Sequence, residues 1–304
     1  MVLENGKIIS LMESKILPIA GDASFRTFYR FISNKGSKII VFAKKEKYKN
    51  LIAYSAINKF LRANKILTPK LYTHKIIASK SNWINGKYQS AKSEKTISVI
   101  SPYFDQEIAT IPESNFADLD NAVKNAQSVF PSWSRLNIRA RAEVMFNLKS
   151  IIENNLDEMA ELIALDNGKT IPDAKGSILR GKEVVEFATS LPSMLRGDSS
   201  PVGPGITCTM TQEPLGVVAG ITPFNFPAMV PLWMIPLAIT TGNCFILKPS
   251  EQTPLSAFKI AEYLKEAGLP DGVFNIVNGA REAVEAICDH PDIKAVAFVG
   301  SSNV

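Results

Sequence analysis

Apolar residues in the C-terminal third of the chain form four short runs separated by helical segments. The apolar runs are Val217–Ile221, Cys244–Leu247, Val273–Val277 and Ala295–Val299. Helices are expected between them, at about Ala228–Thr240, Pro254–Ala267 and Arg281–Cys288. Continuously apolar strands are typical of parallel sheets covered on both faces by right-handed crossover helices. The pattern therefore predicts an α/β fold with a Rossmann-like parallel sheet, which binds ligands beyond the carboxyl ends of its strands.

The middle of the chain is predicted to be a helical scaffold. Its expected helices are Asn115–Phe130, Asn137–Asn154, Leu156–Asp166 and Asp173–Leu195, the last interrupted by Pro192. Gly168 is a helix stop signal. Two further segments indicate strands. The turn Asn85-Gly86 predicts a hairpin at Trp83–Tyr88, within the polar stretch Ser79–Thr96. Apolar and polar residues alternate along Ile206–Gln212, which predicts a strand there.

The N-terminal segment shows a different pattern. Ser24–Ile32 alternates, with Phe25, Thr27, Tyr29 and Phe31 on one face. Ser37–Ala43 is a second expected strand, joined to the first by a turn at Asn34–Gly36. Lys47–Asn64 has helical periodicity, and Pro69 ends that pattern. These segments predict a small α+β unit with little core of its own.

Composition is that of an ordinary folded protein, with 304 residues of which 46% are apolar and 21% charged. The net charge of +5 conceals an asymmetry. Residues 1–80 contain 16 Lys and Arg against 4 Asp and Glu, a balance of +12, whereas residues 81–304 contain 18 against 25, a balance of −7. This change of sign suggests two parts with different roles or origins, or a small module with a solvated basic face. Nucleic-acid binding is not expected, because the aromatic residues of the basic segment alternate within its expected strands.

Several classes of protein are disfavoured. Three cysteines without C-x-x-C spacing and two histidines argue against a disulfide framework and a Cys/His metal site. Met1–Lys15 has no apolar core of an export signal. Pro214–Leu247 has no charge but five prolines, which makes a membrane span improbable. We therefore expect a cytoplasmic protein without a membrane partner.

Polar residues follow the expected parallel strands. Lys248 and Glu251 can bind the hydroxyls of a ribose, or simply form a surface ion pair at a helix start. Gly300-Ser301 can present N–H groups to a phosphate. Asn225 can donate to a developing oxyanion or satisfy backbone groups in a turn. Asn278-Gly279 follows a further strand, and the four ends together predict a binding crevice. No G-x-G-x-x-G fingerprint is present.

These residues resemble the aldehyde dehydrogenase superfamily from about Asn82 to Val304. The most specific likeness is the run Gly220–Pro227, followed by Gly242–Cys244, Lys248–Glu251 and Ala297–Ser301. Most members have Trp where this chain has Phe224. That residue, with Ala228–Met234 and Leu179–Gly181, is similar to the CoA-acylating methylmalonate-semialdehyde branch.

The resemblance implies NAD as cofactor, an aldehyde and CoA as further small-molecule partners, and a homo-oligomer. It implies that Asn225 is the oxyanion donor. The residues that would contact NAD are Thr222, Phe224, Lys248, Glu251, Gln252 and Ser301. Arg180 would face a substrate carboxylate, or alternatively pair with a helix carboxylate such as Glu183.

One departure from the family pattern affects the expected activity. The nucleophilic cysteine of the family lies well after the Gly-Ser turn, and Cys208, Cys244 and Cys288 do not match its motif. The family's general-base Glu and the last strand that builds its oligomers are likewise expected later than Ser301. The sequence thus resembles a helical scaffold and a partial Rossmann-like sheet, expected to be inactive alone. A non-catalytic dinucleotide-binding or subunit-association protein is the alternative.

Residues 1–75 carry a second resemblance. Ala20–Arg26 followed by Phe28–Arg30 is similar to the start of aminoglycoside-phosphotransferase-like sugar kinases, and Leu67–Leu71 continues the likeness to about His74. By this resemblance Gly21–Ser24 would be a phosphate-covering turn, or else a plain hairpin turn. The catalytic Asp of that family would come later. We therefore expect a kinase-like segment at 1–75 and the dehydrogenase-like portion at 76–304, with a sugar kinase fragment as a third alternative.

Overall fold

The computed structural model describes five strands before residue 44 and then residues 81–301 continuously. The chain divides into two compact units, Met1–Tyr72 and Thr73–Val304. The functional division between residues 75 and 76 remains a prediction.

The first unit contains two small antiparallel sheets. One joins β3 (Lys15–Ile19), β4 (Arg26–Ser33) and β5 (Gly36–Ala43) in that order. The other pairs β1 (Val2–Glu4) with β2 (Lys7–Ile9). The predicted pair of strands is present as β4 and β5, whose register places Ser33 opposite Gly36. Asn34 and Lys35 of the expected turn lie outside the described residues. The expected helix at Lys47–Asn64 and the turn at Gly21–Ser24 lie outside the described residues, and the kinase-like assignment stays a prediction.

A six-stranded sheet is the centre of the second unit, in the order β15-β12-β13-β14-β6-β7. The four predicted runs form its parallel part, as β12 (Val217–Ile221), β13 (Cys244–Lys248), β14 (Phe274–Ile276) and β15 (Ile293–Phe298). Their register pairs Ile221 with both Lys248 and Phe298, so the carboxyl ends of these strands meet at one edge.

The sheet as a whole is mixed, because the predicted hairpin extends its parallel part on the side of β14. This hairpin consists of β6 (Ser81–Ile84) and β7 (Lys87–Ser90), and β6 runs antiparallel to β14. Its turn is the predicted Asn85-Gly86, with φ values of 54° and 69°. Trp83 and Ile84 are buried, so the segment belongs to the core rather than to a polar linker.

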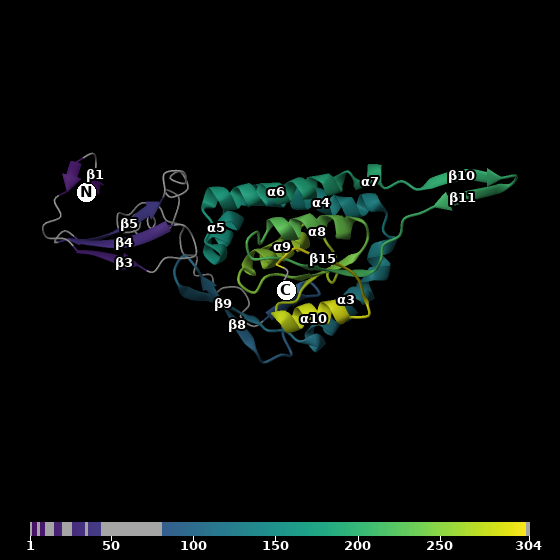
Figure 1. Cartoon of the computed structure of the whole chain (residues 1–304). Helices are drawn as coiled ribbons and strands as arrows, with labels where there is room; N and C mark the ends of the chain where they lie inside the picture. Colours follow the sequence, from purple (N-terminus) through teal and green to yellow (C-terminus); the bar gives the residue numbers. More distant parts are fainter. Residues whose placement is uncertain are drawn as a thin grey trace. The chain divides into compact units, whose positions relative to one another are not determined.

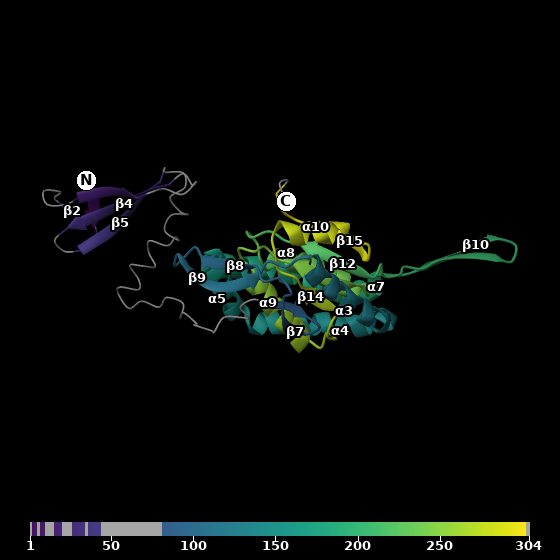
Figure 2. The same cartoon turned by 90° about the horizontal axis from the view of Figure 1, so that it is seen from below.

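Helices cover the two faces of the sheet unequally. On one face lie α8 (Met229–Thr240) and α9 (Leu255–Glu266), and on the other lie α3 (Phe116–Arg135) and α10 (Arg281–Asp289), as Figures 1 and 2 show. A second layer packs outside α8 and α9. It consists of α4 (Ile138–Asn154), α5 (Leu156–Asn167) and α6 (Ile171–Thr189), with the short α7 (Leu191–Met194) after them.

The helix boundaries follow from capping residues and buried side chains. Asn115 and Asp118 form a capping box at the start of α3, and Gly168 ends α5 in the left-handed conformation with φ 77°. The predicted end of α3 at Phe130 was wrong. The helix continues through Pro131 to Arg135 because the buried Trp133 packs there, donating from Nε1 to the carbonyl of Ile239 at 3.1 Å.

Two hairpins among the described residues of the second unit lie outside its six-stranded sheet. The first, β8 (Thr96–Ser101) with β9 (Gln106–Pro112), had not been predicted. The second is a ribbon of β10 (Asp198–Gly203) and β11 (Ile206–Met210), which confirms the strand expected from Ile206 and adds its partner. Figure 1 shows this ribbon projecting from the rest of its unit. Within the described part of the chain, no helix is long and apolar enough to cross a membrane.

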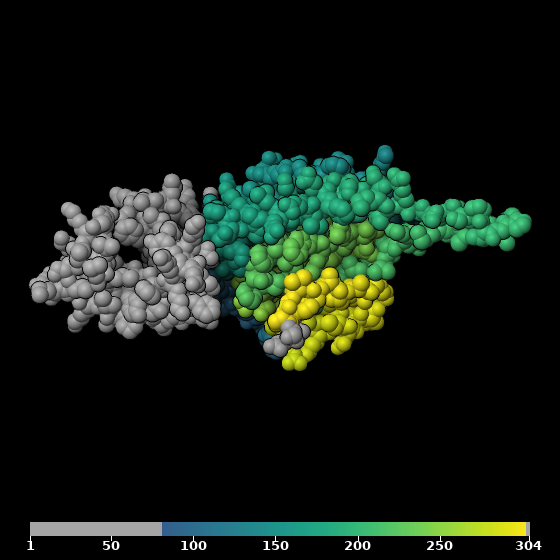
Figure 3. Space-filling model, turned by 45° about the horizontal axis from the view of Figure 1, so that its top comes forward, coloured from purple at the N-terminus to yellow at the C-terminus, as the bar shows by residue number. Residues whose placement is uncertain are grey.

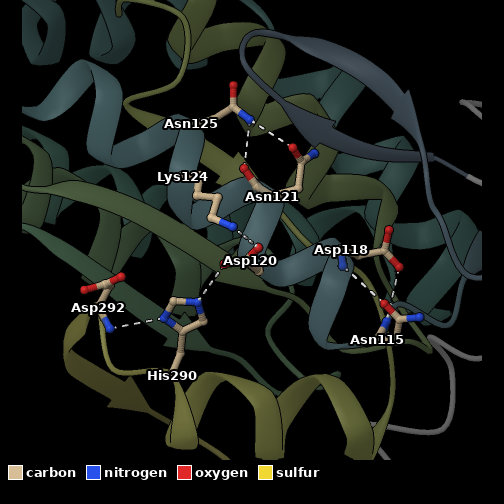
Figure 4. A network of polar contacts seen from close by, with 8 residues as sticks. All are labelled: Asn115, Asp118, Asp120, Asn121, Lys124, Asn125, His290 and Asp292. Atoms are coloured by element: carbon tan, nitrogen blue, oxygen red, sulfur yellow. Dashed lines mark hydrogen bonds and ion pairs between the residues drawn. The ribbon is translucent and has the colours of Figure 1, made fainter.

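A polar network fixes α10 to α3 (Figure 4). The His290 ring at the end of α10 stacks on Phe116, with ring centroids 5.4 Å apart. Its Nε2 lies 3.6 Å from a carboxylate oxygen of Asp120, while its Nδ1 accepts from the backbone N–H of Asp292 at 3.2 Å. The network therefore holds the chain at the entry to β15.

The side chains of β15 are mostly exposed, so the expected cover on both faces was wrong for this strand. Val296 and Phe298 are 41% and 47% exposed. The reason is position: β15 is the edge strand next to β12, whereas the helices pack mainly over β12, β13 and β14. Figure 3 shows the segment that contains α10 and β15 at the surface.

Candidate functional site

Three of the predicted strand ends lie side by side at the carboxyl edge of the sheet. The backbone N–H of Thr222, just after β12, donates to the carbonyl of Lys248 at 3.2 Å. On the other side of β12, Val299 N–H donates to the carbonyl of Ile221 at 3.1 Å and leads into Gly300-Ser301. The edge therefore brings Thr222, Lys248 and the Gly-Ser turn together.

The fourth predicted strand end has a structural role, which corrects the expectation for Asn278. This residue is fully buried. Its N–H donates to Asn82 Oδ1 at 2.8 Å, and its side-chain amide donates to the carbonyl of Ser81 at 3.1 Å. Asn278 thus attaches the β6–β7 hairpin to the sheet instead of facing a crevice.

Lys248 and Glu251 form an ion pair that is buried on one side. Nζ of Lys248 lies 3.1 Å from Oε2 of Glu251, and the side chains are 5% and 35% exposed. A surface pair, the alternative considered from sequence, would leave both groups in water. Here the ammonium is withdrawn from solvent and the carboxylate is partly open, so the carboxylate retains lone pairs for further donors.

The loop from Thr222 to Phe226 presents Asn225. The side chains of Phe224 and Asn225 are exposed, Phe224 to 51%. Within residues 81–301, the side-chain amide of Asn225 makes no hydrogen bond, so both of its N–H groups are available. An exposed amide on a fixed backbone is the arrangement that stabilisation of an oxyanion requires.

Residues from the junction of α5 and α6 hold the backbone of this loop. The carbonyl of Phe224 accepts from Asn167 Nδ2 at 2.7 Å and from Thr253 Oγ1 at 3.3 Å. The carbonyl of Asn225 accepts from Nζ of Lys169 at 2.5 Å. Sequence reasoning missed Asn167 and Lys169, since it interpreted their neighbourhood only as a helix stop.

Lys169 is partly withdrawn from water. Desolvation lowers the pKa of its ammonium group, and the nearby Asp173 carboxylate opposes that shift. The ammonium lies 4.7 Å from the centre of the Phe226 ring, within the range of a cation–π contact. The charged side chain is therefore directed at the loop.

Asp166 connects the same junction to the start of α9. Its Oδ2 accepts from the N–H of Leu255 at 3.1 Å, a helix start that has no side-chain cap of its own. The carboxyl is buried. Burial raises its pKa well above the ordinary value, although backbone N–H groups oppose the shift.

The remaining predicted residues occupy exposed positions. Gln252 lies in the turn after Lys248, and its N–H donates to Ser250 Oγ at 3.3 Å. Ser301 is exposed after Gly300. Arg180 is exposed on α6, and the alternative pairing with Glu183 does not occur among the ion pairs of residues 81–301.

The three thiols lie away from this edge or on other elements. Cys244 begins β13 at the opposite edge of the sheet, where burial raises its thiol pKa to about 12. Cys208 is exposed on β11, and Cys288 is exposed near the end of α10. None of them is in hydrogen-bond contact with Asn225 in the described part of the chain.

Comparison with known proteins gives consistent similarities. Residues 88–304 match the model of the Aldehyde dehydrogenase family. Over 224 residues the chain is 49% identical to malonate-semialdehyde dehydrogenase 1 of Oceanobacillus iheyensis, covering 73% of this chain and 46% of that protein. The relative from Geobacillus thermodenitrificans, with the same printed name, is 47% identical over the same coverage.

Solved structures of this group are similar as well. The crystal structure of a putative methylmalonate-semialdehyde dehydrogenase from Sinorhizobium meliloti, complexed with NAD, has a TM-score of 0.73 and 41% identity, over 76% of this chain and 47% of that one. That of methylmalonate-semialdehyde dehydrogenase from Oceanimonas doudoroffii has a TM-score of 0.72 and 44% identity, over 75% and 46%. The chain thus spans about half the length of the relatives it matches.

Proposed function

Because the chain belongs to the aldehyde dehydrogenase family, we propose that it supplies the NAD-binding and oxyanion-stabilising part of an aldehyde oxidation. The proposal rests on two features that lie together at the carboxyl edge of the sheet. A half-buried Lys248–Glu251 pair lies next to a loop whose backbone is held and whose Asn225 amide is free.

The donor set at this edge fits NAD. Glu251 offers carboxylate oxygens to the two hydroxyls of a ribose, and Lys248 uses one of its three N–H groups on Glu251, leaving donors for the same ribose. The Gly300-Ser301 backbone follows β15 and would face the pyrophosphate, with Thr222, Phe224 and Gln252 beside it. When bound, the cofactor accepts the hydride from the substrate carbon.

Asn225 would donate its side-chain N–H to the oxygen that becomes negative when a nucleophile adds to the aldehyde. Arg180, exposed on α6, would bind a carboxylate carried by the substrate. A substrate with an aldehyde at one end and a carboxylate at the other is a semialdehyde. The names of the relatives favour malonate or methylmalonate semialdehyde. The resemblance to the CoA-acylating branch makes CoA the proposed acyl acceptor.

The thiol of the covalent step is proposed to be none of the three described cysteines. Cys244 is buried with a raised pKa, and its place at the amino end of β13 puts the strand's length between it and the carboxyl edge. Cys208 and Cys288 belong to the ribbon and to α10. We therefore expect no aldehyde turnover from this chain alone. The same placement favours the alternative of a non-catalytic dinucleotide-binding portion.

We also propose self-association through the ribbon of β10 and β11. The ribbon exposes Val202, Ile206 and Met210 to 63%, 61% and 55%. Apolar side chains on an extended two-stranded element gain stability when another surface covers them.

Calorimetric titration with NAD tests the cofactor site. Lys248→Met removes a charge-assisted hydrogen bond, worth about 1.5–3 kcal/mol, so we expect binding to weaken about 10- to 150-fold. Glu251→Gln should also weaken binding. Lys175→Met, which removes the contact of Lys175 with Asp157 elsewhere on the surface, is the matched control and should bind like the parent chain.

A parent chain that binds no NAD, or a Lys248→Met variant that binds equally well while remaining folded, contradicts the assigned site. An assay of NADH formation from malonate semialdehyde with CoA tests the expectation that this chain alone gives no turnover. Turnover that Cys208→Ser or Cys288→Ser abolishes would show that the thiol assignment is wrong.

A further inference from the structure

We propose that Lys169 and Asn167 are positioning residues for Asn225, which they hold through the two backbone carbonyls that flank it. The proposal rests on the proposed role of Asn225 as an oxyanion donor. Lys169 and Asn167 do not touch the reacting atoms, but they set the direction of the Asn225 side chain, which does.

The geometry gives each of the two residues a separate peptide group. The carbonyl of Phe224 belongs to the peptide plane before the Asn225 Cα, and Asn167 donates to it at 2.7 Å. The carbonyl of Asn225 belongs to the plane after that Cα, and Lys169 donates to it at 2.5 Å. Holding both planes restricts φ and ψ of Asn225 together, and these angles determine the direction of its Cα–Cβ bond.

The side chain of Asn225 has no other restraint of this kind. Its amide makes no hydrogen bond within residues 81–301, and the residue is exposed. Its direction therefore depends on the backbone and on its own rotamer. An amide that must meet a developing oxyanion at hydrogen-bond distance needs that backbone fixed before the reaction.

The two donors are mounted on a rigid base. Gly168 ends α5 in the left-handed conformation, and Thr170 caps α6 by accepting from the N–H of Asp173 at 3.3 Å. Asn167 and Lys169 are thus separated by one residue between two capped helix ends. The adjacent Asp166 fixes the start of α9, and Thr253, which precedes that helix, is the second donor to the Phe224 carbonyl.

Lys169 is suited to this contact because its charge is not committed to an ion pair. Within the described residues no carboxylate forms a salt bridge with it, and Asp173 acts only at longer range. The ammonium lies against the Phe226 ring and donates to a carbonyl, which makes a charge-assisted hydrogen bond. The contact should hold the loop more firmly than a neutral donor would.

Nuclear magnetic resonance on this chain tests the proposal. In the parent chain we expect a backbone order parameter of about 0.85 for Asn225. In Lys169→Met it should fall below about 0.6, while the order parameters of β12 and α9 stay unchanged. Lys169→Arg keeps a charged donor and should restore most of the order. Asn167→Ala should loosen the loop independently through the Phe224 carbonyl. Lys182→Met, which breaks a 2.6 Å contact between Lys182 on α6 and Glu153 on α4, is the control and should leave the loop ordered.

A spectroscopic readout separates a direct contact from general loosening. The carbonyl carbon resonance of Asn225 should titrate with the Lys169 ammonium in the parent chain, below the pH at which an ordinary lysine titrates, and should lose that titration in Lys169→Met. The proposal is overturned if the order parameter of Asn225 is unchanged in Lys169→Met and Asn167→Ala. It is also overturned if the carbonyl carbon shift of Asn225 does not change as Lys169 titrates. Because these signals need neither NAD nor turnover, a failed NAD titration would reject the cofactor site without affecting this result.

Discussion

Arg141 is expected to contribute strongly to the stability of the second unit through its side-chain hydrogen bonds. It projects from the start of α4 and is 8% exposed. Its Nε donates to the carbonyl of Thr240 at 2.9 Å, and its Nη1 donates to the carbonyl of Ser134 at 3.0 Å and also to that of Leu136. One guanidinium group therefore satisfies carbonyls at the ends of both α3 and α8.

The cost of replacing Arg141 with Met follows from those contacts. The contact to the Thr240 carbonyl is buried, so loss of its donor costs about 1–3 kcal/mol. The contacts to Ser134 and Leu136 are only part-buried, so their carbonyls can turn to water and cost less. Removal of the charge offsets part of this loss, because desolvation lowers the pKa of the guanidinium and no carboxylate is hydrogen-bonded to it among the described residues. We expect a net loss of about 2–4 kcal/mol in the free energy of unfolding, a large share of the roughly 5–15 kcal/mol of a typical protein.

Urea unfolding followed by circular dichroism measures this loss. Arg141→Lys should give an intermediate value, since one ammonium cannot reach three carbonyls in the geometry of a guanidinium. Arg139→Met, two residues earlier and exposed, is the matched control and should change stability by less than about 0.5 kcal/mol. A loss below about 1 kcal/mol for Arg141→Met would refute the reasoning.

Two further predictions concern Asp166 and Gly181. Burial raises the pKa of Asp166, so the folded chain holds its proton more tightly than the unfolded chain, and stability falls as pH rises above about 4. Asp166→Asn keeps an acceptor for Leu255 N–H and should reduce that fall between pH 5 and 8 in urea titrations; an unchanged slope contradicts the assignment. A Cβ on Gly181 would lie 2.9 Å from Leu232 and 3.2 Å from the Met229 Cα, so Gly181→Ala should lose about 1–2 kcal/mol. Gly176→Ala, on the same helix with nothing within 4 Å of the added Cβ, should instead stabilise by up to about 1 kcal/mol, and equal effects of the two changes would be inconsistent with close α6–α8 packing.

The parallel core was predictable because its signals are local. Each of β12, β13, β14 and β15 is a short apolar run. Of the connecting helices, α9 and α10 have helical periodicity, and α8 is apolar almost throughout. The strand ends then follow from topology, which places Thr222 and Lys248 at one edge without any knowledge of side-chain contacts.

Elements that depend on distant partners were not predictable in the same way. Every residue of β10 except Gly203 is exposed, so the strand has no buried face and its sequence has no alternating pattern of apolar and polar residues. Its structure is determined by pairing with β11. Asn278 was assigned to the crevice because its position after β14 is typical of a ligand contact. The hairpin that occupies it begins almost two hundred residues earlier in the sequence, at Ser81.

The positioning of Asn225 shows the same limit within the candidate site. Asn225 was found from a local motif, whereas Asn167 and Lys169 act on backbone carbonyls 57 and 56 residues away. A side chain that donates to a distant carbonyl leaves no periodicity in the sequence. The one local signal was a polar residue on each side of a helix-ending glycine, and it did not indicate which backbone they would hold.

The attachment of the β6–β7 hairpin to β14 has a consequence for synthesis of the chain. Trp83 pairs with Ile276, and the N–H of Asn85 donates to the side-chain oxygen of Asn275, 190 residues later. At ribosomal rates of about 5–20 residues per second, the hairpin is made roughly 10–40 s before its partner strand. During that interval Trp83 and Ile84 have no sheet against which to be buried, and an open strand edge is exposed. Folding of the second unit should therefore be completed late, and a nascent chain stopped before Phe274 should present this hairpin to chaperones.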